Sequence, residues 1–217
     1  MDPLRVGVFA SGRGSNLEAL LKAIERGRLN ATIVLVVSNN AQAGALQVGR
    51  RHGILALHLA QENFASQEAF DQSLLNALTE HEVEVIALAG YLKKISAKII
   101  REFKHRILNI HPALLPAFGG KGMYGMKVHQ AVLDYGCKVS GVTVHLVDEG
   151  YDTGPPVLQR CVPVKDDDTA ESLAARVLNV EHEIYAQALQ LFAEGRVQVR
   201  DRRVFVKPGS GEPGFGP

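Results

Sequence analysis

Apolar segments and helical patterns alternate along the first half of this chain, and this alternation is the strongest constraint on its fold. Short apolar runs occur at residues 5–10, 32–38, 54–59, 83–89 and 107–110, and helical periodicity occurs between them at residues 16–26, 44–52, 66–81 and 96–103. The run at residues 32–38 is apolar on both faces of a strand, which is typical of a parallel sheet covered on both sides. The sequence therefore predicts an α/β fold with a doubly wound, mostly parallel sheet.

The pattern changes after Pro112. Residues 117–126 hold four glycines and no periodicity, so we expect a loop there, followed by a short helix at residues 127–134. Two longer strands, 138–146 and 156–164, are expected to pair antiparallel at the far side of the sheet. A long helix should run over residues 169–193, with Thr169 as its N-cap and Ser172 in place of the usual Glu of a capping box.

One domain spanning residues 1–206 is expected, ending in a small hairpin of residues 197–200 and 203–206. Residues 207–217 are expected to form a disordered tail, because the stretch from Ser210 onward is rich in Gly and Pro. No internal repeat and no interdomain linker is evident.

The charge balance gives no argument for electrostatic binding to nucleic acid or membrane, since the chain has 24 basic and 23 acidic residues. Cys137 and Cys161 fit no metal or redox spacing and form no disulfide framework. No apolar run approaches the ~18 residues of a membrane span. The first apolar run, at residues 4–10, is too short for the apolar region of a signal peptide. We expect a cytoplasmic protein.

Asn109 and His111 end the apolar run at residues 107–110, just before Pro112. Residues two apart on a strand project from the same face, and proline disfavours helix at the residue before it. The pair therefore offers an amide and a titratable imidazole at the carboxyl end of a strand, where open α/β sheets bind ligands. The alternative is a polar strand end capped by a turn.

The glycine loop at residues 12–17 lies between the first strand and the first helix, a context that suits phosphate at a helix N-terminus. It is not a dinucleotide fingerprint, because Leu17 replaces the third glycine, and no Gly-Lys-Ser/Thr marks a P-loop. A nest for a single phosphate remains, formed by Gly14, Ser15 and Asn16. The alternative is a tight turn capped by Ser or Asn.

Acidic residues cluster in the loop at residues 148–154, where the residues alone single out none of Asp148, Glu149 and Asp152 as catalytic. The eight histidines show no metal-binding spacing, and His182-Glu183 is not followed by a second histidine at zincin spacing. We therefore expect no metal.

Five motifs in fixed order resemble the folate-dependent phosphoribosylglycinamide formyltransferases of purine biosynthesis. The motifs are Ser11-Gly12-Arg13-Gly14-Ser15-Asn16-Leu17, Leu88-Ala89-Gly90-Tyr91-Leu92-Lys93-Lys94-Ile95-Ser96, Leu108-Asn109-Ile110-His111-Pro112-Ala113-Leu114-Leu115-Pro116, Gly141-Val142-Thr143-Val144-His145 and Asp152-Thr153-Gly154-Pro155. The resemblance covers residues 4–206. It implies a formyltransferase-type fold with antiparallel C-terminal strands. It also implies a monomeric or homodimeric protein that acts on small molecules without a metal.

The resemblance also implies a reaction, in which 10-formyltetrahydrofolate donates its formyl group to the amine of 5'-phosphoribosylglycinamide. Asn109 and His111 match the family's catalytic pair, with His111 as a charged donor and general acid. Asp152 matches the carboxylate that holds the imidazole and favours its protonated form. Other matches concern binding: Gly14, Ser15 and Asn16 for the phosphate, Glu181 for the ribose, and Leu92, Lys93, Lys94, Ile95 and Asn109 for folate. Gln67 stands where some members carry an arginine near the folate's glutamate tail, and His129 and His145 are further candidates at the substrate end.

Three rival functions share part of this pattern. Methionyl-tRNA formyltransferases and formyltetrahydrofolate hydrolases use the same Asn–His–Asp chemistry, but they usually carry an additional RNA-binding or regulatory domain, for which we expect no room here. A non-catalytic phosphate-binding module would retain the glycine loop but has no reason to bring Asn109, His111 and Asp152 together. Separation of these three side chains in the structure would favour it.

Overall fold

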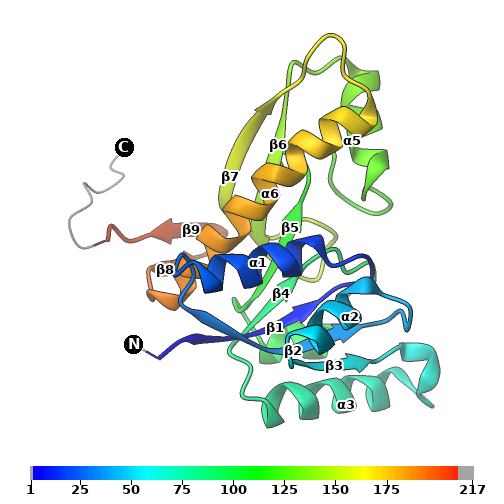
Figure 1. Ribbon diagram of the computed structural model, residues 1–217, viewed down its shortest axis with the longest axis vertical. Coiled ribbons are helices and arrows are strands. Elements are labelled where there is room, and N and C mark those ends of the chain that lie inside the picture. Colours follow the sequence, from blue (N-terminus) through cyan, green and yellow to red (C-terminus); the bar gives the residue numbers. More distant parts are fainter. Residues whose placement is uncertain (1, 210–217) are drawn as a thin grey trace.

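A central sheet covered by helices on both faces forms the body of the molecule (Figure 1), as described by a computed structural model for residues 2–209. The predicted tail from residue 210 onward lies outside these described residues. The sheet contains β1 (Leu4–Phe9), β2 (Ala31–Ser38), β3 (Leu55–His58), β4 (Val85–Leu88), β5 (Ile107–His111), β6 (Val139–Leu146) and β7 (Pro156–Pro163). The helices are α1 (Ser15–Glu25), α2 (Gly44–Arg51), η1 (a 3-10 turn, Gln61–Asn63), α3 (Gln67–Glu80), α4 (Ala97–Glu102), α5 (Met126–Tyr135) and α6 (Ala170–Ala193).

The strand order is β3-β2-β1-β4-β5-β6-β7. The first five strands pair in parallel, and β6 and β7 add antiparallel strands at one side. The predicted α/β class and the antiparallel C-terminal strands are therefore confirmed. The chain reverses its direction of winding between β1 and β4, so the loops that follow these two strands open a crevice at their carboxyl ends.

Alternate residues of each strand face different helices, which explains why β1 and β2 are apolar throughout. Val8 points into a core shared with α1, α2 and α6, whereas Phe9 points into a second core shared with α3 and α4. Leu17 of α1 packs in the first core, and Leu74 of α3 packs in the second. Both faces of the sheet are covered by buried apolar side chains, as the sequence predicted from the apolar run in β2.

Side-chain caps mark the starts of three helices. The hydroxyl oxygens of Ser66, Ser96 and Thr169 each accept a hydrogen bond from a backbone N–H in the first turn of α3, α4 and α6. The predicted capping box is confirmed: Thr169 Oγ1 accepts from the backbone N–H of Ser172, and Ser172 Oγ accepts from the backbone N–H of Thr169. Predicted helix and strand boundaries differ from the observed ones by one or two residues, the usual fraying at element ends.

A small hairpin of β8 (Val197–Arg200) and β9 (Arg203–Val206) follows α6, as predicted. Lys207, the first residue of the predicted tail, still donates a backbone hydrogen bond to Arg196. Within residues 2–209, none of the helices combines the length and apolar character that crossing a membrane requires.

Candidate active site

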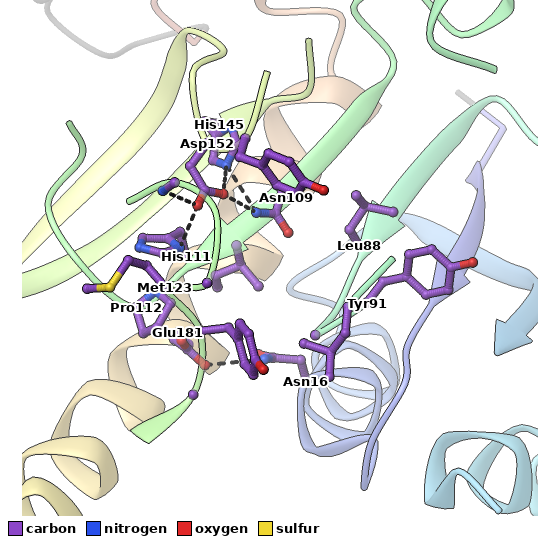
Figure 2. Close-up of a pocket in the computed structure, with 18 of the residues that line it drawn as sticks. Asn16, Leu88, Tyr91, Asn109, His111, Pro112, Met123, His145, Asp152 and Glu181 are labelled. Carbon is purple, nitrogen blue, oxygen red and sulfur yellow. Dashed lines mark hydrogen bonds and ion pairs between the residues drawn. The ribbon is translucent and has the colours of Figure 1, made fainter. Parts of the chain in front are cut away.

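A cavity of about 810 Å³ opens at the carboxyl ends of β1, β4 and β5. Figure 2 shows its three sides. Asn109, His111, His145 and Asp152 form one side, Leu88 and Tyr91 a second, and Asn16 and Glu181 the far end. The loop between β5 and α5, including Met123, covers the cavity near His111.

Asp152 is the centre of the polar cluster. Its Oδ2 atom accepts a hydrogen bond from the backbone N–H of Gly120 at 2.9 Å and lies 3.6 Å from Nδ1 of His111. Its Oδ1 atom accepts from Nδ2 of Asn109 at 3.4 Å and lies 3.6 Å from Nε2 of His145. Burial works to raise the pKa of Asp152, but the contacts with His145, Gly120 and His111 outweigh it and lower this pKa. Asp152 is therefore a carboxylate at neutral pH.

His111 is almost completely buried, with 3 % of its surface exposed. Burial lowers the pKa of His111 below its ordinary value, and the charge of Asp152 and the carbonyl of Phe118 oppose this shift without cancelling it. The expectation that Asp152 holds a charged imidazole stays a prediction. Asp152 acts in the expected direction, but the desolvation of a buried ring is the larger effect.

The ring nitrogens of His111 both face oxygen atoms. Nε2 lies 2.8 Å from the carbonyl oxygen of Phe118, which can only accept, so Nε2 carries a proton. In the neutral ring, Nδ1 then presents a lone pair to Asp152, and only the charged ring satisfies both contacts. The site is thus balanced between a neutral ring favoured by burial and a charged ring favoured by its neighbours.

His145 fixes the orientation of the Asn109 amide. Nδ1 of His145 donates to the carbonyl of Leu146 at 2.8 Å, so in the neutral ring Nε2 is an acceptor. Nδ2 of Asn109 lies 3.1 Å from this Nε2 and uses its second proton on Asp152. The amide oxygen of Asn109 is consequently the atom that faces the cavity (Figure 2).

The acidic loop shows why one carboxylate differs from its neighbours. Asp152 has a left-handed backbone with φ +55°, which Asp tolerates better than most residues and which turns its side chain towards β5. Asp148 instead accepts hydrogen bonds from the N–H of Gly150 and the hydroxyl of Thr153, and so stabilises the turn itself. This division of roles depends on backbone geometry, which the sequence pattern does not reveal.

The glycine loop is held rigidly between α1 and α2. Gly14 has φ +90°, and a Cβ atom there would lie 2.8 Å from the Cα of Ala45 in α2. No side chain caps α1, so its first amides have no side-chain acceptor within the described chain. Asn16 lines the cavity, whereas Ser15 lines a neighbouring groove between α1 and α6. The phosphate nest stays a prediction.

Glu181 reaches the far end of the cavity from α6, far away in the sequence from the other site residues. Nδ2 of Asn16 donates to Oε2 of Glu181 at 3.3 Å, and Oδ1 of Asn16 is buried with no partner among residues 2–209. Burial raises the pKa of Glu181 to about 7. This pair presents both an acceptor and a titratable acid to a ligand at this end.

The predicted folate segment forms the second wall of the cavity. Gly90, with φ +77°, starts the segment, and the backbone N–H of Leu92 donates to the hydroxyl of Ser11 at 2.9 Å. Four predicted folate residues, Leu92, Lys93, Lys94 and Ile95, all line the cavity. Gln67 does not: it lies exposed in the first turn of α3 and donates to Asp71 at 2.7 Å, and its folate role stays a prediction.

Two histidines carry more of the site than the sequence indicated. His145 lies opposite Asn109 in the antiparallel β5–β6 pair, so strand register, once known, would have placed it in the cluster. His129 lines the cavity from α5, and its Nδ1 atom is buried without a partner in the described part of the chain. Burial and the nearby His111 lower the pKa of His129.

No group of three or more His, Cys, Asp and Glu side chains within residues 2–209 is arranged to hold a metal ion. The three predicted catalytic side chains, in contrast, lie in direct contact. This arrangement is the one that a phosphate-binding module without catalysis would not require.

A family model described as formyl transferase matches residues 4–189. The chain belongs to the formyl transferase family. The order of motifs had predicted this family, and the prediction is confirmed.

Solved and curated members of the family show how far the likeness extends. A chloroplastic phosphoribosylglycinamide formyltransferase of Vigna unguiculata is 45% identical over 193 residues, which cover 89% of this chain and 62% of that protein. The structure of glycinamide ribonucleotide transformylase 1 from Symbiobacterium toebii is 42% identical, covers 94% of both chains and has a TM-score of 0.88. A formyltetrahydrofolate deformylase from Pseudomonas syringae is 28% identical, with a TM-score of 0.83, over 94% of this chain and 66% of its own.

The chain thus spans less than two thirds of the length of its plant relative. That relative's name places it in the chloroplast, so the cytoplasmic location expected here stays a prediction.

Proposed function

We propose that this protein transfers a formyl group from 10-formyltetrahydrofolate to the amine of 5'-phosphoribosylglycinamide in purine biosynthesis. The observation that carries the proposal is that a reactive cluster and a separate polar binding end line the same cavity. Asn109, His111 and Asp152 form a reactive cluster at one side, and Asn16 with Glu181 forms a polar end beside the uncapped α1. The names of the relatives supply the substrate.

The proposed reaction requires proton transfer as well as charge stabilisation. The amine nitrogen bonds to the formyl carbon, and the carbonyl oxygen of the formyl group becomes an oxyanion. The oxyanion then reforms the carbonyl as the bond between the formyl carbon and N10 breaks and N10 takes up a proton. Once its contact with Phe118 is broken, a neutral His111 that carries its proton on Nδ1, facing Asp152, can accept at Nε2 the proton that the amine loses and deliver it to N10. Asp152 stabilises the imidazolium that forms between these two steps.

Asn109 has a separate proposed role. Its amide oxygen faces the cavity and is suited to accept an N–H of the attacking amine, which aligns the nitrogen lone pair with the formyl carbon. Rotation of the amide would instead aim an N–H at the oxyanion, at the expense of the contacts with His145 and Asp152.

His111 cannot reach a substrate while its Nε2–H bonds to Phe118. Both loop contacts of the cluster, the carbonyl of Phe118 and the N–H of Gly120, belong to the segment between β5 and α5. We therefore infer that binding of the two substrates shifts residues 117–125, and that the formyl oxygen or N10 replaces the Phe118 carbonyl as the partner of His111.

The residues proposed to bind the two substrates are those that the resemblance to the family implies. Gly14, Ser15 and Asn16 would hold the phosphate at the N-terminus of α1, and Glu181 would accept from or donate to the ribose hydroxyls. Leu92, Lys93, Lys94 and Ile95 would form the folate wall. No metal takes part in this scheme, and the protein would act as a monomer or homodimer.

The test is formyl transfer by the purified protein, with 10-formyltetrahydrofolate and phosphoribosylglycinamide and no added metal. Formylated product and tetrahydrofolate should appear in equal amounts. Failure to form the product with both substrates present would reject the proposal.

A second candidate is hydrolysis of 10-formyltetrahydrofolate, because a formyltetrahydrofolate deformylase shares this fold. Water would then replace the amine at Asn109, and formate would be released without phosphoribosylglycinamide. Measuring formate in the same assay separates the two reactions. The polar end at Asn16 and Glu181 favours the transfer, since hydrolysis has no use for a sugar site.

A further inference from the structure

Among residues 2–209, Tyr185 is the largest completely buried side chain, and its hydroxyl group contacts β4 and β5, two of the strands that carry the cavity. The Oη atom is 3.0 Å from the carbonyl oxygen of Leu88 and 3.1 Å from that of Leu108. Burial and the charge of Glu181 raise the pKa of Tyr185 well above its ordinary value, so the hydroxyl keeps its proton as a donor. One proton is thus shared between the last residue of β4 and the second residue of β5.

These two carbonyls each adjoin a segment of the proposed active site. Leu108 directly precedes Asn109, and Leu88 ends β4 immediately before the turn into the Gly90–Ile95 wall. Leu88 is also paired with Asn109 in the β4–β5 register. A small shift at this joint would move the Asn109 amide and the predicted folate wall relative to each other.

Glu181 is four residues before Tyr185 on α6, and residues at this spacing lie on the same face of a helix. Apolar residues of α6, such as Ile184 and Leu189, pack against the sheet, but apolar contacts fix distance better than they fix register along the helix axis. Within residues 2–209, no other side-chain hydrogen bond joins α6 to β4 or β5. The hydroxyl is thus the directional link between Glu181 and the strands.

We propose that Tyr185 is a positioning residue, whose hydroxyl fixes the span between the sugar end of the cavity on α6 and the reacting end on β4 and β5. The proposal rests on the proposed function for its kinetic test, though not for its structural one. Tyr185 touches no substrate; it acts through Glu181, Asn109 and the folate wall.

Tyr185→Phe tests the proposal, because it keeps the buried ring and removes only the hydroxyl. Each substrate alone uses one end of the cavity, so the separately measured dissociation constants of phosphoribosylglycinamide and a folate analogue should stay near their wild-type values. Turnover needs both ends in register, and misplacement of this kind lowers kcat by about ten- to a hundredfold. A merely structural role would lower Tm and leave kcat unchanged at temperatures below it.

Ile184→Val is the matched control. Ile184 is buried on the same helix turn, lines no part of the cavity and should lose a comparable amount of stability, but its kcat should remain that of the wild type. Wild-type kcat in Tyr185→Phe, or an equal fall in Ile184→Val, would overturn the proposal.

Hydrogen exchange gives a structural readout that needs no activity. In Tyr185→Phe, the backbone amides of Asn109, Ile110 and Leu92 should exchange faster than in wild type and in Ile184→Val. If the wild type transfers no formyl group, the proposed function fails while this test still stands. Unchanged exchange at these amides would reject the positioning role by itself.

Discussion

At the scale of single residues, the site places ionisable groups where burial and neighbouring charge act in opposite directions. His111 is the clearest case, because desolvation lowers its pKa while Asp152 works to raise it. Such opposition keeps a group close to the point at which substrate charge can change its protonation, which is what a proton carrier requires.

Replacing Asp152 by Asn should therefore lower the pKa of His111 further, since the main effect that raises it is lost. Asparagine tolerates the left-handed backbone at this position, so the fold should be kept. We expect kcat to fall by about 100-fold or more, in the range of lost general acid–base catalysis. The measurement is NMR titration of His111 together with kcat in both proteins.

Asp148→Asn is the comparison for this variant, because the Asp148 carboxylate bonds to the turn and pairs with Arg202 rather than with His111. Its His111 titration should match that of the wild type. A wild-type titration in Asp152→Asn, with activity retained, would instead assign the carboxylate role to another acid of the loop.

Glu181 makes a second prediction at this scale, concerning stability and pH. Burial raises its pKa from 4.5 to about 7, so the folded state binds the proton more tightly than the unfolded chain. This contribution is fully present below pH 4.5 and is lost as the pH rises through about 7, at a cost of up to about 3 kcal/mol. Gln resembles the protonated acid and cannot ionise.

The Tm of Glu181→Gln should thus exceed that of the wild type at pH 8 by more than it does at pH 5. Thermal melts of the two proteins across this range give the comparison. A difference in Tm that is independent of pH would show that Glu181 does not titrate between the folded and unfolded states.

At the scale of elements, helix α2 restricts which residues fit in the turn between β1 and α1, independently of any ligand. Gly14 has a positive φ and lies against Ala45, whereas a Cβ atom on Gly12 would meet nothing within 4 Å. Gly14→Ala should therefore cost at least about 1–2 kcal/mol of folding free energy, the penalty for a left-handed residue. Gly12→Ala should change stability by about 0.5 kcal/mol or less.

The same two variants separate the structural and the binding roles of the loop. Denaturant unfolding gives the stability of each, and the KM for phosphoribosylglycinamide reports on the phosphate nest. Ser15→Ala adds a third comparison, because it removes a predicted phosphate donor without changing the turn. If Ser15→Ala alters KM for folate and for the phosphorylated substrate alike, the nest is in the wrong place.

The folate wall makes a prediction for the whole segment from Gly90 to Ser96. A bound folate analogue should protect these backbone amides from hydrogen exchange, because the segment lines the cavity and Leu92 is 59 % exposed without ligand. Exchange measured by mass spectrometry with and without the analogue provides the test. Protection restricted to residues 11–16 would place the folate elsewhere.

The order of elements could be predicted from the sequence because apolar period and capping residues are local signals. Ser66, Ser96 and Thr169 cap helices where the pattern begins, and no distant contact is needed to find them. The β6–β7 pair was also visible, since two long strands separated by a short loop tend to pair.

The composition of the site could be predicted only in part, because it depends on contacts between distant segments. His145 joins the cluster through the β5–β6 register, and Glu181 reaches Asn16 across 165 residues. The choice of Asp152 over Asp148 came from resemblance to the family and not from the pattern of residues. The effect of burial on His111 required the packed structure, since desolvation is a property of the surroundings.

At the scale of the whole molecule, one edge of the sheet carries both the phosphate end and the reacting end of the proposed site. The first lies at the start of α1, after β1, and the second lies across the crevice on β5 and the loop after β6 (Figure 1). Because the same sheet carries both ends, binding energy gained at the phosphate can hold the amine in place at Asn109.

The unphosphorylated riboside should consequently be a poor substrate, although its reacting amine is unchanged. We expect kcat/KM to fall by about 100-fold or more, because energy from the remote phosphate contributes to positioning in the transition state. Adding inorganic phosphite or phosphate should restore part of this rate by occupying the N-terminus of α1, and Ser15→Ala should weaken that restoration. A riboside that reacts as fast as the phosphorylated substrate would mean that the uncapped end of α1 takes no part in positioning, and that the reacting cluster alone determines the rate.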